Sequence, residues 1–249
     1  MGSPQVESDR KANEAVRLVS FSEDFYLAIF ETTVGQFSSG AWDRQRNDAP
    51  VVNVNYYDLR GDTVDWPTDG HALSDSSPLV RLRGRTGIPD FDLPTEAQWG
   101  FACRAGTMSA FSFDESADLP KYAWFTGNSG GVVHDVGKKL PNAWGIYDLI
   151  GCCHQWTTTS PVLGANGGPA KHADGVDPIG PGPQMGTGPF RVCKGSHART
   201  GGGSSQLRVQ RVAYRMLQRS NCQNGTLNGT TFTAEQGNTG CRLSLRLED

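Results

Sequence analysis

The sequence lacks the features that mark several common classes of protein. It has no run of about 18 apolar residues, which excludes a membrane-spanning helix of ordinary length. Its formal net charge of -3 over 249 residues is small, so charge favours neither a nucleic-acid partner nor a membrane-surface partner. No secretory signal peptide is recognisable, and Met1-Gly2-Ser3 is typical of an expression scar, so we expect a native leader to have been removed.

Motifs for catalysis and for metal binding are also scarce. There is no CxxC pair for zinc, no GxSxG and no phosphate-binding glycine loop. The five histidines form no HxH or HxxH pair; they are His71, His134, His154, His172 and His197. The six cysteines allow 15 disulfide pairings, and burial as small apolar side chains is the favoured alternative. These cysteines are Cys103, Cys152, Cys153, Cys193, Cys222 and Cys241.

What the sequence does contain predicts a loop-rich α+β protein. Glycine (31) and proline (14) are frequent, while 37% of residues are hydrophobic, which is enough for a core but favours irregular backbone over a helical bundle. The charged stretch over residues 1–15 predicts a flexible leader. Residues 17–30 predict a hairpin that ends in a strand over Phe25–Phe30. Residues 160–188, rich in Gly, Pro and Ala, predict a long surface loop.

Short helices are predicted wherever a capping residue precedes an apolar pattern. Thr32 or Thr33 can cap a helix that carries Val34 and Phe37. Asn55 can cap a helix that begins at Tyr56. Two longer helical patterns follow. Pro78–Gly87 predicts a helical stretch that stops at its glycine, and Thr95 with Gln98 forms a capping box before Trp99.

The most distinctive stretch is Pro141–Trp156, which reads PNAWGIYDLIGCCHQW. Aromatic residues bury large areas, and glycines permit sharp turns, so this stretch predicts a core built from irregular backbone. It resembles the NxWGLYDMxGNVWEW signature of the formylglycine-generating enzymes, also called sulfatase-modifying factors. Further blocks resemble that family in the same order, namely PVVNVNYYD (50–58), LPTEAQWGFACRAG (93–106), RVCKGS (191–196), RVAYR (211–215) and GCRL (240–243).

The resemblance covers residues 25–245 and implies one domain of the family's C-type-lectin-type fold. We therefore predict a leader over residues 1–15 and a sulfatase-modifying-factor-like domain over residues 16–249. Trp99, Trp144 and Trp156 are expected to be buried and to hold its frame.

The same resemblance bears on chemistry. Formylglycine-generating members bind copper through two cysteines, which would align near Gly202 and Leu207, and residues 197–207 contain no cysteine. We therefore expect no formylglycine-generating activity and no catalytic residue. An iron-dependent oxidase or oxygenase of the same family is the alternative. The resemblance also implies a candidate calcium site, with side chains at Asp148 and Gln155 and main-chain carbonyls at Gly151 and Cys153; otherwise no cofactor is expected.

The segment over residues 196–240 is rich in Ser, Gly, Asn and Thr, with a few large side chains, a composition that suits an adaptable binding surface and also suits ordinary loops. A non-catalytic branch of the family, the variable proteins of diversity-generating retroelements, keeps the fold and rewrites this segment. The resemblance implies a monomeric display protein at a cell or phage surface that binds a protein or another macromolecule. Its candidate contact residues are His197, Arg199, Leu217, Arg219, Ser220, Asn221, Asn224 and Asn228.

Overall fold

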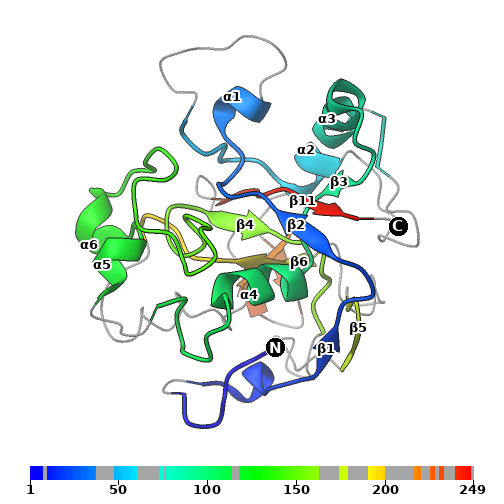
Figure 1. Cartoon of the computed structure of the whole chain (residues 1–249). Coiled ribbons are helices and arrows are strands. Elements are labelled where there is room, and N and C mark those ends of the chain that lie inside the picture. Colours follow the sequence, from blue (N-terminus) through cyan, green and yellow to red (C-terminus); the bar gives the residue numbers. More distant parts are fainter. Residues whose placement is uncertain are drawn as a thin grey trace.

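The protein is built from short elements that irregular connections join (Figure 1). The computed structural model describes residues 1–7, 10–37, 48–60, 73–75, 77–113, 118–162, 174–178, 190–199, 216–219, 225–227, 230–232 and 239–247. The helices are a 3-10 turn at Ala12–Glu14, α1 Val34–Phe37, α2 Tyr56–Arg60, α3 Pro78–Thr86, α4 Glu96–Arg104, α5 Leu119–Tyr122 and α6 Thr126–Ser129. None of these described helices is long and apolar enough to cross a membrane.

The strands form one larger and three smaller sheets within the described residues. Their bounds are β1 Val19–Ser20, β2 Phe25–Leu27, β3 Phe91–Asp92, β4 His154–Trp156, β5 Gly175–Val176, β6 Phe190–Lys194, β7 Met216–Arg219, β8 Gly225–Leu227, β9 Thr230–Phe232, β10 Thr239–Gly240 and β11 Ser244–Arg246. The larger sheet has the order β10-β4-β6-β7, and a three-stranded sheet has the order β2-β11-β3. The mixture of helices, short strands and irregular backbone confirms the predicted α+β class.

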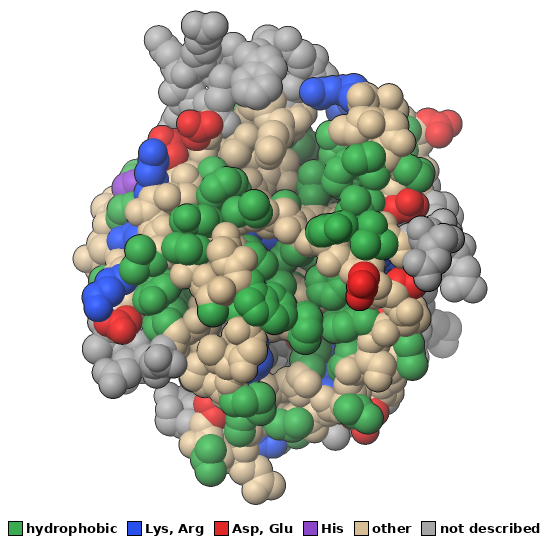
Figure 2. Space-filling model, viewed as in Figure 1, with side chains coloured by type: hydrophobic (Ala, Val, Ile, Leu, Met, Phe, Trp, Pro, Cys, Tyr) green, Lys and Arg blue, Asp and Glu red, His purple; other side chains and the backbone are tan. Residues whose placement is uncertain are grey.

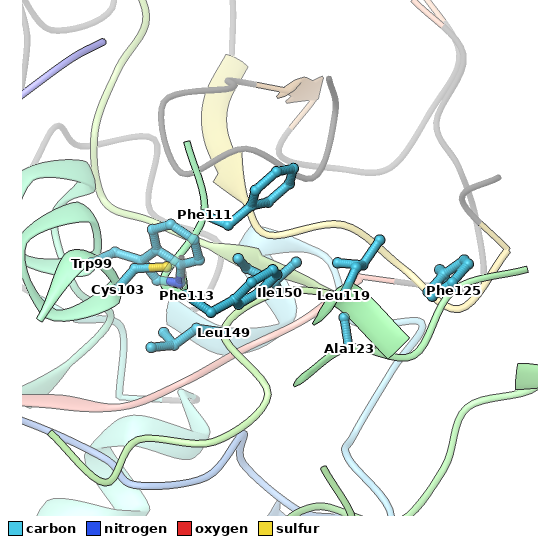
Figure 3. Close-up of a cluster of buried hydrophobic side chains, with 9 residues drawn as sticks. All are labelled: Trp99, Cys103, Phe111, Phe113, Leu119, Ala123, Phe125, Leu149 and Ile150. Carbon is cyan, nitrogen blue, oxygen red and sulfur yellow. The ribbon is translucent and has the colours of Figure 1, made fainter. Parts of the chain in front are cut away.

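Two buried clusters form the core. The first gathers beneath α4 and the loops that follow it (Figure 3); its members are Trp99, Cys103, Phe111, Phe113, Leu119, Ala123, Phe125, Leu149 and Ile150. The second joins α2 to the larger sheet; its members are Val51, Val54, Tyr56, Leu59, Leu93, Trp156, Cys193 and Cys241. The indole N–H groups of Trp99 and Trp156 both donate hydrogen bonds, to Gln155 Oε1 (2.8 Å) and to the Val54 carbonyl (2.8 Å). Their partners offset the loss of water around these buried donors.

The predicted helix starts are confirmed. Thr95 Oγ1 accepts from Gln98 N (3.1 Å), and Gln98 Oε1 accepts from Thr95 N (2.9 Å), which completes the capping box of α4. Asn55 and Asp58 exchange the equivalent two bonds at the start of α2. Gly87 ends α3 with a φ of 70°, a left-handed conformation that glycine adopts without strain.

Two predictions about the fold are wrong. Residues 17–30 do not form a hairpin, because β1 pairs with β5 in parallel while β2 pairs with β11. The local sequence pattern predicts a hairpin, whereas β1 and β2 each pair with a strand that is distant in sequence. Trp144 is not a buried frame residue: 49% of its surface is exposed, and its ring packs edge-on against Phe101, itself half exposed.

The predicted leader folds back onto the domain over its described residues. Ser3 N donates to the Glu14 carbonyl (2.7 Å), and Met1 exchanges hydrogen bonds with Arg17. The Arg104 guanidinium on α4 donates to the Gly2 carbonyl (2.6 Å). These bonds tie the described part of residues 1–15 to Arg17 and to α4.

Candidate functional site

The candidate binding segment begins and ends on the two sides of strand β4. Gln155 in β4 is registered with Lys194 of β6 on one side and with Gly240 of β10 on the other. The chain therefore leaves the larger sheet after β6, rejoins it at β7 beside β6, and enters it again at β10. The two ends of the segment both pair with one residue of β4.

Buried charges fix these two attachment points. Lys194 is fully buried, and its Nζ lies 3.7 Å from Glu96 Oε1. Arg242, two residues after β10, is also fully buried, and its guanidinium donates to the carbonyls of Ala28, Ile29 and Tyr147 at 2.6–2.9 Å. A buried charge is tolerated only when it is paired and hydrogen-bonded, so these contacts hold both ends of the segment in place.

The Gln155 side chain connects the two ends through the core. Its Oε1 accepts from Trp99 Nε1 (2.8 Å) and from Arg242 Nε (3.0 Å). Its Nε2 donates to Glu31 Oε1 (3.0 Å) and to the Asp148 carbonyl (2.8 Å). These four bonds use the full donor and acceptor capacity of the amide. A glutamine at this position therefore has a structural role that a carboxylate could not fill in the same way.

Glu31 lies at the end of this network and is fully buried. Removal from water, reinforced by the nearby Asp148 charge, raises the pKa of Glu31 to about 8, and Arg242 opposes the rise. The carboxyl is therefore mainly protonated at neutral pH. Its Oε1 also accepts from Cys153 Sγ (3.0 Å). Sequence reasoning did not single out Glu31, whereas Arg242 belongs to the GCRL block (240–243) that carries the family resemblance.

The candidate calcium residues all belong to this buried region. Asp148 Oδ2 accepts from Gly137 N (2.7 Å), and burial raises the pKa of Asp148. Gly151 N donates to Ser196 Oγ (3.0 Å). The structure thus brings Asp148 and Gln155 together, but Gln155 contacts the main-chain carbonyl of Asp148 and not its side chain. Calcium binding by this set stays a prediction, which titration calorimetry with calcium chloride would check.

Of the candidate contact residues, His197 and Arg199 have described side chains. His197 is buried, and its ring meets that of His154 edge-on with 4.9 Å between centroids. Its Nδ1 accepts from Arg199 N (3.1 Å). Arg199 is exposed, and its Nε donates to the Gly131 carbonyl (3.1 Å). His197 therefore supports the backbone from which Arg199 reaches the surface.

The other candidates are placed less fully. Leu217 and Arg219 belong to β7, where their backbones pair with Val192 and Phe190 of β6. The remaining four candidates lie outside the described residues; they are Ser220, Asn221, Asn224 and Asn228. The positions expected to align with the copper-binding cysteines, Gly202 and Leu207, lie outside them as well.

A group of fixed aromatic and basic residues flanks Arg199, and sequence reasoning missed it. The rings of Trp124 and His134 stack with 3.7 Å between centroids, and Lys139 Nζ lies 3.8 Å above the Trp124 ring. His134 Nε2 donates to the Ser129 carbonyl (2.9 Å), and Ser129 Oγ donates to the Ala198 carbonyl (2.5 Å). Nothing local in the sequence signals this stack, because Trp124 lies ten or more positions from His134 and Lys139.

The described cysteines are free and buried, as the favoured alternative predicts; they are Cys103, Cys152, Cys153, Cys193 and Cys241. Burial raises the pKa of Cys103 and of Cys241 to about 12, so both remain thiols rather than metal-binding thiolates at neutral pH. Within the described ranges, no three His, Cys, Asp or Glu side chains are grouped so that they could hold a metal ion.

Comparison with known proteins identifies the class. A family described as the sulfatase-modifying factor enzyme 1-like domain matches residues 1–231, so the chain belongs to this family, as its motifs predict. The match includes the residues that we assigned to a leader. The formylglycine-generating enzyme of Mycobacterium tuberculosis is 28% identical over 137 residues, which cover 47% of this chain and 44% of that enzyme. The alignment thus spans less than half of the relative.

Solved structures with the same fold include proteins of different kinds. Treponema denticola variable protein 1 superposes with a TM-score of 0.61 at 23% identity, covering 98% of this chain and 92% of that one. PvdO from Pseudomonas aeruginosa gives a TM-score of 0.63 at 20% identity, with coverages of 99% and 90%. At these identities the likeness establishes the fold, a single sulfatase-modifying-factor-like domain of the C-type-lectin type. It includes a variable protein of the branch that the sequence resembles.

Proposed function

We propose that this protein is a non-catalytic ligand-binding protein whose segment 196–240 is a diversified binding surface. The observation that carries the proposal is the anchoring of both ends of this segment on Gln155 of β4. Lys194 and Arg242 hold these ends through buried contacts with other parts of the chain. Side chains between the anchors can change without removing any of these contacts.

The fixed surface next to the segment suits a macromolecular partner. Arg199 is exposed beside the stack of Trp124 and His134, with Lys139 above it. Arginine and tryptophan are enriched among the residues that contribute most to binding at protein interfaces. We infer that Trp124, His134 and Lys139 contact the ligand at a constant position, while Arg199 and the rest of segment 196–240 supply specificity. A protein or another macromolecule is the proposed ligand, and a cell or phage surface the proposed location.

The loss of cysteines supports a non-catalytic role. Copper(I) prefers soft thiolate ligands, and residues 197–207 offer none. The resemblance to variable proteins of diversity-generating retroelements combines the same loss with a retained fold. In that branch adenines of the gene are replaced, and an AAC codon changed in this way cannot encode Met, Gln or Glu. Met216, Gln218 and Glu235 therefore cannot come from that codon; each is either fixed by the template or derived from another codon.

Deep sequencing of codons 190–245 in a growing population tests the proposal. We expect substitutions at adenine-bearing codons between residues 196 and 240, with the codons of Lys194, Gly240 and Arg242 unchanged. If no substitution in the segment is more frequent than the sequencing error, diversification is contradicted. Two purified variants provide a matched control: Arg199→Ala should weaken ligand binding and keep the melting temperature, whereas Arg242→Ala should lower the melting temperature.

A metal-dependent oxidase or oxygenase is the second candidate function. The contact between the buried rings of His154 and His197 favours it, because paired imidazoles are common iron ligands. Elemental analysis and oxygen-consumption assays on protein loaded with iron or copper distinguish the two functions. Stoichiometric metal with turnover that His154→Ala abolishes would establish the enzyme and overturn the non-catalytic proposal.

A further inference from the structure

The three-stranded sheet exposes an apolar row on its outer face. Leu245 of β11 is registered with Tyr26 of β2 on one side and with Phe91 of β3 on the other. Side chains alternate along a strand, so the neighbouring row, which contains Ser244 and Asp92, points the opposite way; both are buried. The outer row is only partly covered, and Tyr26 is 61% exposed. Figure 2 shows hydrophobic side chains gathered on this face, around β2, β11 and α3.

Helix α3 forms a rigid wall along this row. Ser77 Oγ at its start donates to the Leu59 carbonyl of α2 (2.6 Å) and accepts from Leu79 N (3.0 Å). Later in the helix, Arg83 Nε donates to the Phe91 carbonyl of β3 (2.9 Å). These bonds attach α3 to α2 at its start and to β3 through Arg83, so the groove between the helix and the sheet is preformed.

The groove is large enough for a small ligand and is mostly apolar. Its volume is about 480 Å³, and α1 closes it opposite α3 through Gln36 and Phe37. Its deep end is lined by the buried residues Leu59, Leu79 and Cys241. Ligand pockets in proteins typically have roughly 300–1,000 Å³, apolar walls and a few polar groups that fix orientation.

The polar groups on the rim are basic. Arg81 and Arg85 line the groove from one exposed face of α3, one helical turn apart. Among the described residues that line the groove, none is Asp or Glu. A basic rim over an apolar groove, in a chain whose net charge is -3, is complementary to an amphiphile with an anionic head.

We propose that this groove binds a long-chain carboxylate, with the hydrocarbon chain along the row of Tyr26, Leu245 and Phe91 and the carboxylate at Arg81 and Arg85. The site is separate from the proposed ligand surface, because Figure 1 places α3 and α6 on opposite sides of the molecule. It belongs to the constant part of the protein, so every diversified copy would carry it.

Calorimetric titration of the full chain with octanoate, laurate and palmitate tests the proposal. We expect one saturable site. Each buried methylene adds about 0.8 kcal/mol of binding free energy, so affinity should rise about fourfold per added methylene until the groove is filled. Methyl laurate, which lacks the charge, should bind more weakly than laurate. Equal affinity for the acid and the ester, or no saturable binding, would overturn the proposal.

Three variants locate the site. The double change Arg81→Glu with Arg85→Glu should weaken laurate binding about tenfold, through loss of two ion pairs and added repulsion. Arg199→Glu makes the same kind of change at the other surface and should leave laurate binding unaltered. Leu82→Trp should obstruct the groove. If the arginine double variant binds laurate as the parent does, the site is not here. If the parent instead forms a dimer that Leu82→Trp dissociates, and laurate does not bind, a second copy occupies the groove and the proposal fails.

Discussion

Replacing Glu31 by Gln should remove a large part of the pH dependence of stability. The pKa of this buried carboxyl is raised from 4.5 to about 8, mainly by removal from water. Between these two pH values the folded protein holds a proton that the unfolded chain has released. Stability from this group is therefore fully present below about pH 4.5 and falls as pH rises towards 8.

The magnitude follows from the size of this window. Each pH unit within it changes the unfolding free energy by about 1.4 kcal/mol, so Glu31 alone should remove about 4 kcal/mol between about pH 5 and pH 8. Glutamine has the same shape and keeps an acceptor for Gln155 Nε2 and Cys153 Sγ. It does not titrate, so the variant should show a much flatter profile.

Urea unfolding followed by tryptophan fluorescence at several pH values measures the effect. The quantity of interest is the difference between parent and variant at each pH, because all other titrating groups cancel in it. Glu23→Gln, a change at an exposed glutamate, is the matched control and should leave the profile of the parent unaltered. Parallel profiles for the parent and Glu31→Gln would refute the reasoning about burial.

Four further changes probe the scaffold by urea unfolding. Gln155→Leu should lower the unfolding free energy by about 3 kcal/mol, because it leaves Trp99 Nε1 and the buried Arg242 Nε without an acceptor; a loss below about 1 kcal/mol would be incompatible with this. Gly240→Ala should destabilise by at least about 2 kcal/mol, because the new Cβ would overlap the Val51 carbonyl oxygen and lie 3.0 Å from the buried Cys153 Sγ. Gly84→Ala, in open space on α3, should instead stabilise by about 0.5–1 kcal/mol. Thr95→Ala should cost about 1 kcal/mol by removing the α4 cap, and an unchanged midpoint would show that the cap is dispensable.

The local features of the fold were predictable from sequence, and the long-range ones were not. Thr95 with Gln98, and Asn55 with Asp58, form caps that depend on residues three positions apart, so spacing alone is informative. The pairing of β1 with β5 joins residues more than 150 positions apart, and short strands of two residues carry no periodicity that could reveal it.

The candidate site likewise has features that the sequence predicted and features that it did not. Composition and family resemblance located the segment over residues 196–240. They did not reveal that Glu31 and Gln155 form the buried network between its ends, since single polar residues give no pattern. Trp144 shows the opposite error: its place in an aromatic-rich block suggested burial, whereas the folded chain leaves 49% of it exposed.

The attachment of both ends of the segment to one central strand also bears on its length. Strands in a sheet lie about 4.8 Å apart, so β6 and β10, on the two sides of β4, hold these ends roughly 10 Å apart whatever lies between them. The free-energy cost of closing a loop grows only with the logarithm of its length, by about 0.6 kcal/mol for each doubling. Insertions and deletions between Lys194 and Thr239 that leave β7 intact should therefore be tolerated almost as well as substitutions, and related chains can vary in the reach of these connections as well as in their chemistry.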